Sequence, residues 1–178
     1  MVRMNDDKPA VSPAFRIASI AILAAVTTVL TRVVQIPLPA RGYINLGDVA
    51  IVFTAITLGP FSAALAGGLG TALADLLSGP YAFWAPISLI VHGLQGLLIG
   101  LIAQVRPNNI GPQILGGIVG IIVMAGGYLL AGVFLEGAGP ALTEVPGNLI
   151  QGGVGVVLGI LVGAAVSRAY PPVRQWKW

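Results

Sequence analysis

Long apolar runs alternate along most of the chain with short segments that contain proline, glycine or polar residues. A run of about 20 apolar residues is long enough to cross the hydrocarbon core of a bilayer as one helix. Four runs each predict one membrane-spanning helix, over about residues 14–34, 86–105, 112–135 and 146–166. The segments beside them predict loops on the outer face, at residues 35–44, 79–86 and 136–145.

A fifth uncharged run, residues 49–74, poses a question of topology because Gly59-Pro60 interrupts it near the middle. As one helix it would be about 39 Å long, whereas a hairpin gives two shorter helices, the first over about residues 45–58 and roughly 21 Å long. The basic residues near both termini favour the same side of the membrane, which requires an even number of crossings. The hairpin is therefore predicted, with part of its short first arm inside the protein rather than against lipid.

The pattern thus predicts an all-α integral membrane protein, a bundle of six transmembrane helices with both the N- and the C-terminus in the cytoplasm. Its composition agrees: 56% of the 178 residues are hydrophobic and only 8% are charged, against about 25% charged residues in a soluble domain. The chain divides into a cytoplasmic tail at residues 1–13, a six-helix membrane domain at 14–168 and a basic cytoplasmic tail at 169–178.

Charge and cysteine content exclude several other classes. The formal net charge of +3 comes from small basic groups beside the apolar runs, which is typical of cytoplasmic flanks and does not indicate a nucleic-acid partner. The chain has no cysteine, so disulfides and thiolate chemistry are excluded. Asp6 and Asp7 precede the first apolar run and no small-residue cleavage site follows it, so this run is expected to be a retained helix rather than a signal peptide.

Polar and aromatic residues next to or inside the apolar runs gather in the predicted outer half of the membrane. Intramembrane polar groups are costly, so a functional role is their default interpretation. Together they predict a pocket that opens outward and suits a small, flat organic ligand. The candidate binding residues are Tyr43, Asn45, Asp48, Asp75, Tyr81, Trp84, Ser88, His92, Gln95, Asn148 and Gln151.

Each candidate also has a structural explanation. Asp48 is placed to cap a helix N-terminus, where the helix dipole favours a carboxylate. Asp75 lies near a helix C-terminus, where the dipole disfavours an anion, so a cationic or donor partner such as His92, Arg41 or the ligand is expected. His92 is equally compatible with a bond to a neighbouring helix. The two candidate aromatic residues of segment 79–86 also suit the headgroup level of the membrane.

Patterns of catalysis are missing from the sequence. It contains no HExxH motif, no nucleophile elbow and a single histidine, so neither an enzyme nor a metal or other cofactor is expected. The glycine cluster Gly67-Gly68-Leu69-Gly70 lies within a predicted helix and lacks the Lys-Ser/Thr of a phosphate loop. The chain is therefore not expected to drive transport by hydrolysing ATP itself.

Small residues form stripes on three helices. The first helix carries Ala14, Ala18, Ala21 and Ala25 at spacings of three and four, which permits close helix contact either within the bundle or with a partner. The predicted fifth and sixth helices are rich in glycine, and those of the sixth, at 155, 159 and 163, repeat every four residues. Such seams suit helix packing and also association between copies.

Several short motifs resemble the substrate-binding S components of energy-coupling factor (ECF) vitamin transporters, most closely the riboflavin-type or general S-component branch. The resemblance is strongest over about residues 40–103. The motifs are Tyr43-Ile44-Asn45-Leu46-Gly47-Asp48, Leu58-Gly59-Pro60, Ala66-Gly67-Gly68-Leu69-Gly70, Ala72-Leu73-Ala74-Asp75-Leu76 and Gly93-Leu94-Gln95-Gly96-Leu97.

This resemblance implies a multi-pass protein of the plasma membrane that binds a water-soluble vitamin or precursor of the riboflavin, thiamine-precursor or pyridoxine type at its outer face. It further implies docking on a membrane T component that sits on two ATP-hydrolysing subunits. The family's Ala-xxx-Ala motif on the first helix contacts the T component, and Ala21 and Ala25, with Ala14 and Ala18 as a second frame, match that spacing. The family's pocket is walled by helices four to six and closed by loops.

One departure bears on the substrate. A lysine and a glutamate commonly occupy, in this branch, the positions held here by His92 and Gln95, so a charged pair is replaced by neutral or titratable groups. Arg41, in the segment expected to close the pocket, is suited to pair with a ligand carboxylate or phosphate. Two other hypotheses stand beside the importer subunit: a small transporter or channel that works without an ATPase partner, and a membrane scaffold without a ligand.

Overall fold

The computed structural model describes residues 12–107 and 109–176. Most of the predicted tail at 1–13 and the last two residues of the chain lie outside this range. The described residues form six α-helices, two short strands and two 3-10 helices. Their bounds are α1 Pro13–Val33, β1 Ile36–Pro37, β2 Tyr43–Ile44, α2 Gly47–Thr57, α3 Pro60–Leu77, η1 Ala82–Trp84, α4 Ala85–Ala103, α5 Ile110–Glu136, α6 Ala138–Ala169 and η2 Pro171–Gln175.

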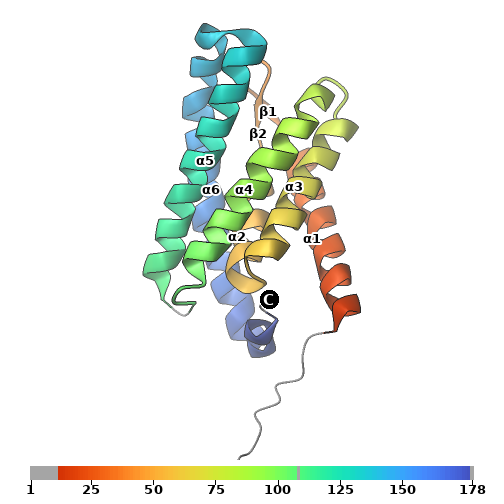
Figure 1. Ribbon diagram of the computed structural model, residues 1–178, viewed down its shortest axis with the longest axis vertical. Coiled ribbons are helices and arrows are strands. Elements are labelled where there is room, and N and C mark those ends of the chain that lie inside the picture. The colour runs from red at the N-terminus through yellow and green to blue at the C-terminus, as the bar shows by residue number, and fades with distance from the viewer. Residues whose placement is uncertain (1–11, 108, 177–178) are drawn as a thin grey trace, which may run out of the picture.

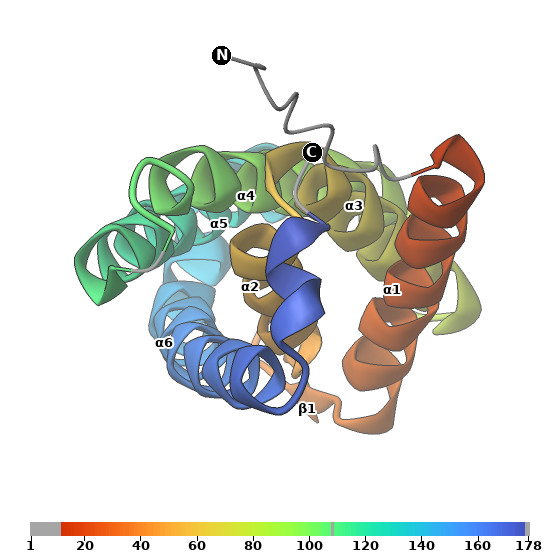
Figure 2. The ribbon, with the colours of Figure 1, turned by 90° about the horizontal axis from the view of Figure 1, so that it is seen from below.

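The long helices surround the short helix α2. Figure 1 shows α3, α4, α5 and α6 running alongside one another, and Figure 2 shows α2 in the middle of them with α1 at one edge. α1 packs against α3, and α2 contacts α1, α3, α4 and α6. The antiparallel pair β1–β2 links α1 to α2 at the upper end in Figure 1. Within the described residues, five helices are long and apolar enough to cross a membrane.

α2 is the exception because it has 11 residues and is therefore roughly 16 Å long. Nine of these residues are buried, among them Asp48, Ile51 and Thr54. The helix ends at Thr57. The chain then turns at Gly59, whose φ of 102° lies in the region that glycine occupies without strain, and Pro60 begins α3. The prediction of two helices across residues 49–74 is confirmed. Part of the first helix was expected inside the protein, and most of it is buried.

The glycine seam of α6 accommodates α2. A Cβ atom added at Gly155 would lie 2.3 Å from the Cβ of Asp48, and one added at Gly159 would lie 2.6 Å from the Cβ of Val52. These distances are far below carbon–carbon contact, so only glycine permits this approach. The seam is consequently used inside the bundle and does not offer a face for association between copies.

The junction of α5 and α6 corrects the prediction of an outer loop at residues 136–145, which is wrong. Only Gly137, with a φ of 90°, separates the two helices, and α6 begins at Ala138. Pro146, taken as the start of the sixth helix, lies inside α6. A proline within a helix removes one backbone hydrogen bond without always ending the helix. α5 and α6 are therefore about 40 and 48 Å long and extend above the other helices in Figure 1.

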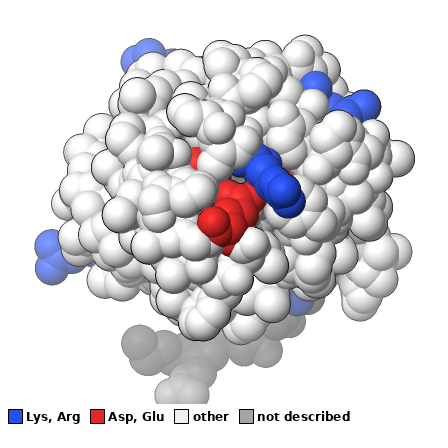
Figure 3. Space-filling model, turned by 90° about the horizontal axis from the view of Figure 1, so that it is seen from above, with Lys and Arg blue, Asp and Glu red and all other residues white. Residues whose placement is uncertain are grey.

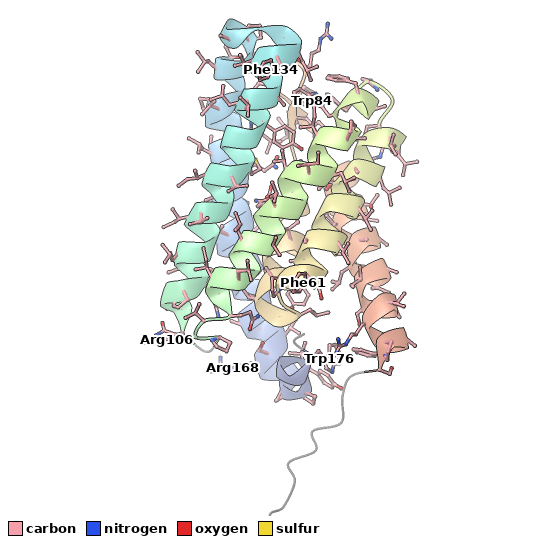
Figure 4. All side chains as sticks on the ribbon, viewed as in Figure 1. Phe61, Trp84, Arg106, Phe134, Arg168 and Trp176 are labelled. Carbon is pink, nitrogen blue, oxygen red and sulfur yellow. The ribbon has the colours of Figure 1, made fainter. Side chains whose placement is uncertain are left out.

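The opposite end of the bundle carries the short helix η2. Val173 of η2 is buried, with an exposed fraction of 2%. The ring of Trp176 lies edge-on against Phe15 of α1 at 4.9 Å and also contacts Tyr170. The first part of the predicted C-terminal tail thus joins the ends of α6 and α1. Figure 4 shows Trp176 at this lower end with Arg106 and Arg168, whereas Trp84 lies near the upper end.

Candidate functional site

A small cavity lies at the upper end of the bundle, between the β1–β2 pair, α3, α4, α5 and α6. It encloses about 30 Å³, which is room for one or two water molecules. Seven of the eleven candidate residues line it, whereas Asp48, Tyr81, His92 and Gln95 do not. The residues that line it are Gly42, Tyr43, Asn45, Asp75, Trp84, Ser88, Tyr128, Glu144, Asn148 and Gln151.

The first of two polar networks is centred on Asp75, in the last turn of α3. Its carboxylate accepts hydrogen bonds from the Tyr43 hydroxyl at 2.6 Å and from the Ser88 hydroxyl. The Ser88 and Tyr128 hydroxyls also bond to each other. Asp75 is only 3% exposed, and its partners are hydroxyl groups rather than His92 or Arg41. The expectation of a donor partner is confirmed, but the two named candidates are not the ones found.

Tyr43 lies outside the membrane-spanning segments, on β2. Burial, followed by the negative charge of Asp75, raises the pKa of its phenol above the ordinary value. The phenol therefore remains protonated and keeps donating to the carboxylate. Its ring also packs against that of Tyr81, with the two planes tilted by 43° and ring centroids 4.4 Å apart.

The second network is centred on Asp48, in the first turn of α2. Its two carboxylate oxygens accept from the side-chain amides of Gln95 on α4 and Gln151 on α6. Gln151 in turn accepts from the backbone N–H and the side chain of Asn45, at 2.8 and 3.1 Å. The Nδ1 atom of His92 lies 2.6 Å from Oε1 of Gln95.

Asp48 is therefore not the helix cap that one explanation offered, since no side chain caps α2 at Leu46. It still benefits from its place in the first turn, where the dipole favours an anion. Asp48 is 1% exposed and links α2 to α4 and α6. The side-chain Oδ1 of Asn45 also accepts from the Gly47 N–H, so this side chain links the start of α2 to Gln151 of α6.

Trp84 belongs to the interior rather than to a lipid-facing belt. It is 3% exposed, and its ring lies edge-on to Tyr128 at 5.6 Å. Its indole Nε1 donates to the backbone carbonyl of Arg41 at 3.0 Å. The indole is thus both a wall of the cavity and an attachment for the segment between β1 and β2.

The segment of residues 36–44, which we call the outer hairpin, covers the cavity. Glu144, 6% exposed, accepts from the backbone N–H of Gly42 at 2.6 Å, and Leu38 packs closely on Gly147 of α6. Above the hairpin, Arg41 and Glu136 line a wider outer hollow, and Figure 3 shows acidic and basic side chains side by side there.

Three residues of the cavity were not predicted: Gly42, which contributes backbone only, Tyr128 and Glu144. Tyr128 sits in a glycine-rich apolar run, where a single hydroxyl was the only available signal. Glu144 lies in the segment assigned to an outer loop, which removed it from consideration. Its carboxylate is instead fixed on a continuous helix above the cavity, where it faces the hairpin backbone.

Comparisons with known proteins identify a family that matches the sequence and solved structures that share the fold. The sequence model of the family described as "ECF-type riboflavin transporter, S component" matches residues 14–168. Two solved structures share the fold: one described as the S component of a bacterial ECF transporter, with a TM-score of 0.66 over 89% of this chain and 98% of that one, and ThiT from Listeria monocytogenes, with a TM-score of 0.67 over 93% and 98%. Both are 24% identical to this chain.

Two relatives match in sequence. A thiamine precursor transporter, HmpT, of Lactococcus lactis subsp. cremoris (strain MG1363) is 32% identical over 155 residues, covering 86% of this chain and 88% of the relative. A Pyrococcus woesei protein described as "uncharacterized protein in gap 3'region" is 35% identical over 149 residues, covering 83% and 99%. The chain belongs to the ECF riboflavin-transporter S-component family. It is a substrate-binding subunit of an ECF-type transporter and a multi-pass protein of the plasma membrane.

Proposed function

We propose that this S component takes up a small nitrogen heterocycle with amino or hydroxyl groups, of the thiamine-precursor type, through the outer cavity. The observation that carries this proposal is the set of groups around the cavity: the Asp75 carboxylate with its hydroxyl partners, beside the rings of Trp84, Tyr43 and Tyr128. Aromatic walls suit a flat ring, and a buried acceptor suits a donor group on it. The thiamine precursor named for the relative HmpT is a ligand of this kind.

The size of the cavity implies that binding requires movement. About 30 Å³ is far below the 300 Å³ or more of a typical small-molecule site. The outer hairpin is the element that closes the cavity from above, and a small set of side-chain contacts holds it there. These contacts are Glu144 to the Gly42 N–H, Trp84 to the Arg41 carbonyl, Leu38 on Gly147 and the Tyr43 hydroxyl to Asp75. The hairpin is therefore proposed as the lid over the ligand.

The orientation follows from charge. The chain passes through the bundle six times if α2 and α3 are counted as a descending and an ascending arm, so both ends of the described chain lie at the lower end of Figure 1. Arg106 and Arg168 lie at that end as well, and basic residues favour the cytoplasmic side. We therefore assign both termini to the cytoplasm and the cavity to the outer face.

The coupling partners are proposed to be a membrane T component and two ATP-hydrolysing subunits. Support comes from α1, whose inward face is marked by Ala24, Thr27 and Thr31, whereas its four predicted contact residues are exposed. Packing within the bundle therefore does not bury the alanine stripe, which leaves a face of small side chains that another helix can approach closely. These exposed residues are Ala14, Ala18, Ala21 and Ala25.

Uptake by proteoliposomes tests this function. Vesicles containing the S component alone should not accumulate a thiamine precursor, whereas vesicles that also contain the T component and both ATPase subunits should do so when ATP is supplied. Accumulation without the ATPase subunits would instead favour a transporter that works alone. Accumulation of none of thiamine, its pyrimidine and thiazole precursors, riboflavin or pyridoxine by the complete assembly would contradict the proposed substrate class.

A further inference from the structure

Almost all polar side chains that line the outer cavity have a hydrogen-bond partner within the protein. The network around Asp75 uses the hydroxyl groups of the cavity. Trp84 and Glu144 bond to the backbone of the outer hairpin, and the side-chain amides of Asn45 and Gln151 bond to each other. These side chains are therefore committed to contacts that shape the cavity and hold the hairpin.

Asn148 of α6 is the exception among the polar side chains described for the cavity. It lines the cavity and is only 7% exposed, yet its amide forms no hydrogen bond with any described residue. The unpaired hydroxyls of Thr31 and Ser62 are sealed inside the protein, whereas the Asn148 amide is not among the sealed atoms. Glu144 and Gln151 lie one turn before and after it and line the same cavity. The unused amide can therefore be satisfied only by water or by a ligand in the cavity.

The chemistry of this amide narrows the choice of ligand. A primary amide presents a donor and an acceptor side by side, so it forms two parallel hydrogen bonds with a ring edge on which an amino group adjoins a ring nitrogen, as Asn does with adenine. The rings of Trp84 and Tyr128 line the same cavity and suit a flat partner. A carboxylate or phosphate offers no donor to the amide oxygen and would lie beside the acidic side chains of Asp75 and Glu144.

We propose that Asn148 determines the specificity of the outer cavity by pairing its free amide with the amino group and the adjacent ring nitrogen of an aminopyrimidine. The inference rests on the proposed function and deepens it, because it names the edge of the ligand that is recognised and the residue that recognises it. The committed side chains around the cavity shape the site, whereas Asn148 exchanges water for the ligand when the outer hairpin opens.

The variant Asn148→Leu tests this role, because leucine is similar in size and has neither a donor nor an acceptor. Titration calorimetry with the aminopyrimidine precursor of thiamine should show a roughly 10- to 100-fold loss of affinity, the range expected for a two-point pair. The unfolding transition of the ligand-free protein should stay the same or rise, because no described residue loses a hydrogen bond. Equal affinity of wild type and N148L would overturn the proposal.

Gln151→Leu is the matched contrast one turn along α6. It removes three hydrogen bonds within the protein, so it should lower the unfolding transition of the ligand-free protein. A loss of stability in N148L as large as that in Q151L would show that the Asn148 amide is engaged within the protein and would overturn its role as a free group.

The ligand offers a second test that needs no variant to fold. An analogue with hydrogen in place of the amino group should bind wild type roughly 10-fold less tightly, or about 1.4 kcal/mol. In N148L the two ligands should bind nearly equally, since the cycle of both changes isolates the pair. Equal binding of the two ligands by wild type, or an equal loss in both proteins, would overturn the proposal.

These measurements separate the inference from the proposed function. Wild type that binds the aminopyrimidine with an affinity independent of Asn148 would overturn the inference and leave the proposed function standing. Wild type that binds riboflavin or pyridoxine but not the aminopyrimidine would overturn both.

Discussion

Replacing Gly155 by alanine is a direct test of how α6 positions the Asp48 network. The added Cβ would lie 2.3 Å from the Cβ of Asp48 and 3.3 Å from its Cα. Carbon atoms in contact are about 3.5 Å apart or more, so α2 and α6 must separate by roughly 1 Å. Because the neighbouring atoms belong to the main chain and the Cβ of a buried residue, a side-chain rotation cannot relieve the clash.

The expected change in the stability of Gly155→Ala is the difference between two opposing effects. Overpacking a tight contact costs about 1–3 kcal/mol, and alanine in a helix returns roughly 0.5–1 kcal/mol relative to glycine. The midpoints of these two ranges give a net loss of stability of about 1 kcal/mol, or roughly 2–4 °C in the unfolding transition of a protein of this size. A separation of about 1 Å would also stretch the 2.6 Å bond between Asp48 and Gln151 beyond hydrogen-bonding distance.

Gly153 offers the matched control, because it lies on the same helix and a Cβ added there meets nothing within 4 Å. Gly153→Ala should leave the transition unchanged or raise it, since it gains helix propensity without a clash. Thermal unfolding of both purified variants, followed by tryptophan fluorescence, is the assay. Equal transitions for Gly155→Ala, Gly153→Ala and wild type would refute the packing of α2 on the α6 seam.

Three further changes test separate parts of the account. Tyr43→Phe removes a donor to the buried Asp75 carboxylate and should lower stability by about 1.5–3 kcal/mol, so an unchanged unfolding transition would show that this bond is absent. Trp84→Phe keeps an aromatic wall but loses the bond to the outer hairpin, so ligand release in a displacement assay should be roughly 2–10 times faster; equal release rates would separate Trp84 from the lid. A double change of Ala21 and Ala25 to leucine should abolish uptake by the complete assembly while ligand affinity stays the same, and normal uptake would exclude this face of α1 as the contact with the T component.

The helical architecture was largely predictable because membrane sequences must satisfy their backbone within each segment. The break at Gly59-Pro60 and the parity of basic residues together gave the short buried helix α2. The start of the last helix was wrongly predicted at Pro146, because a proline at the start of a helix and one inside a helix can have the same local sequence. The 32-residue α6 shows that Pro146 lies inside a helix. This outcome depends on how α6 packs in the bundle, which a local sequence pattern does not reveal.

The sequence predicted most of the residues that form the site but not the hydrogen bonds that join them. Asp75 and Ser88 stood out as polar groups in apolar surroundings, yet their pairing depends on the crossing of α3 and α4. Spacing along α4 placed His92 and Gln95 on one face, but the sequence contains nothing that assigns Gln95 to Asp48, which lies 47 positions earlier. Tyr128 was missed because an isolated tyrosine in a membrane helix is usually an interfacial anchor.

The central claim is that the outer cavity binds a small vitamin precursor, and titration calorimetry on the purified protein tests it most directly. The titration compares wild type with Tyr128→Phe, which removes a hydroxyl from the cavity, and with Tyr170→Phe, which removes one from an exposed position at the other end of the bundle. The account predicts that the pyrimidine precursor of thiamine binds wild type and Tyr170→Phe equally and binds Tyr128→Phe less tightly. Equal binding by all three proteins, or binding by none, would contradict it.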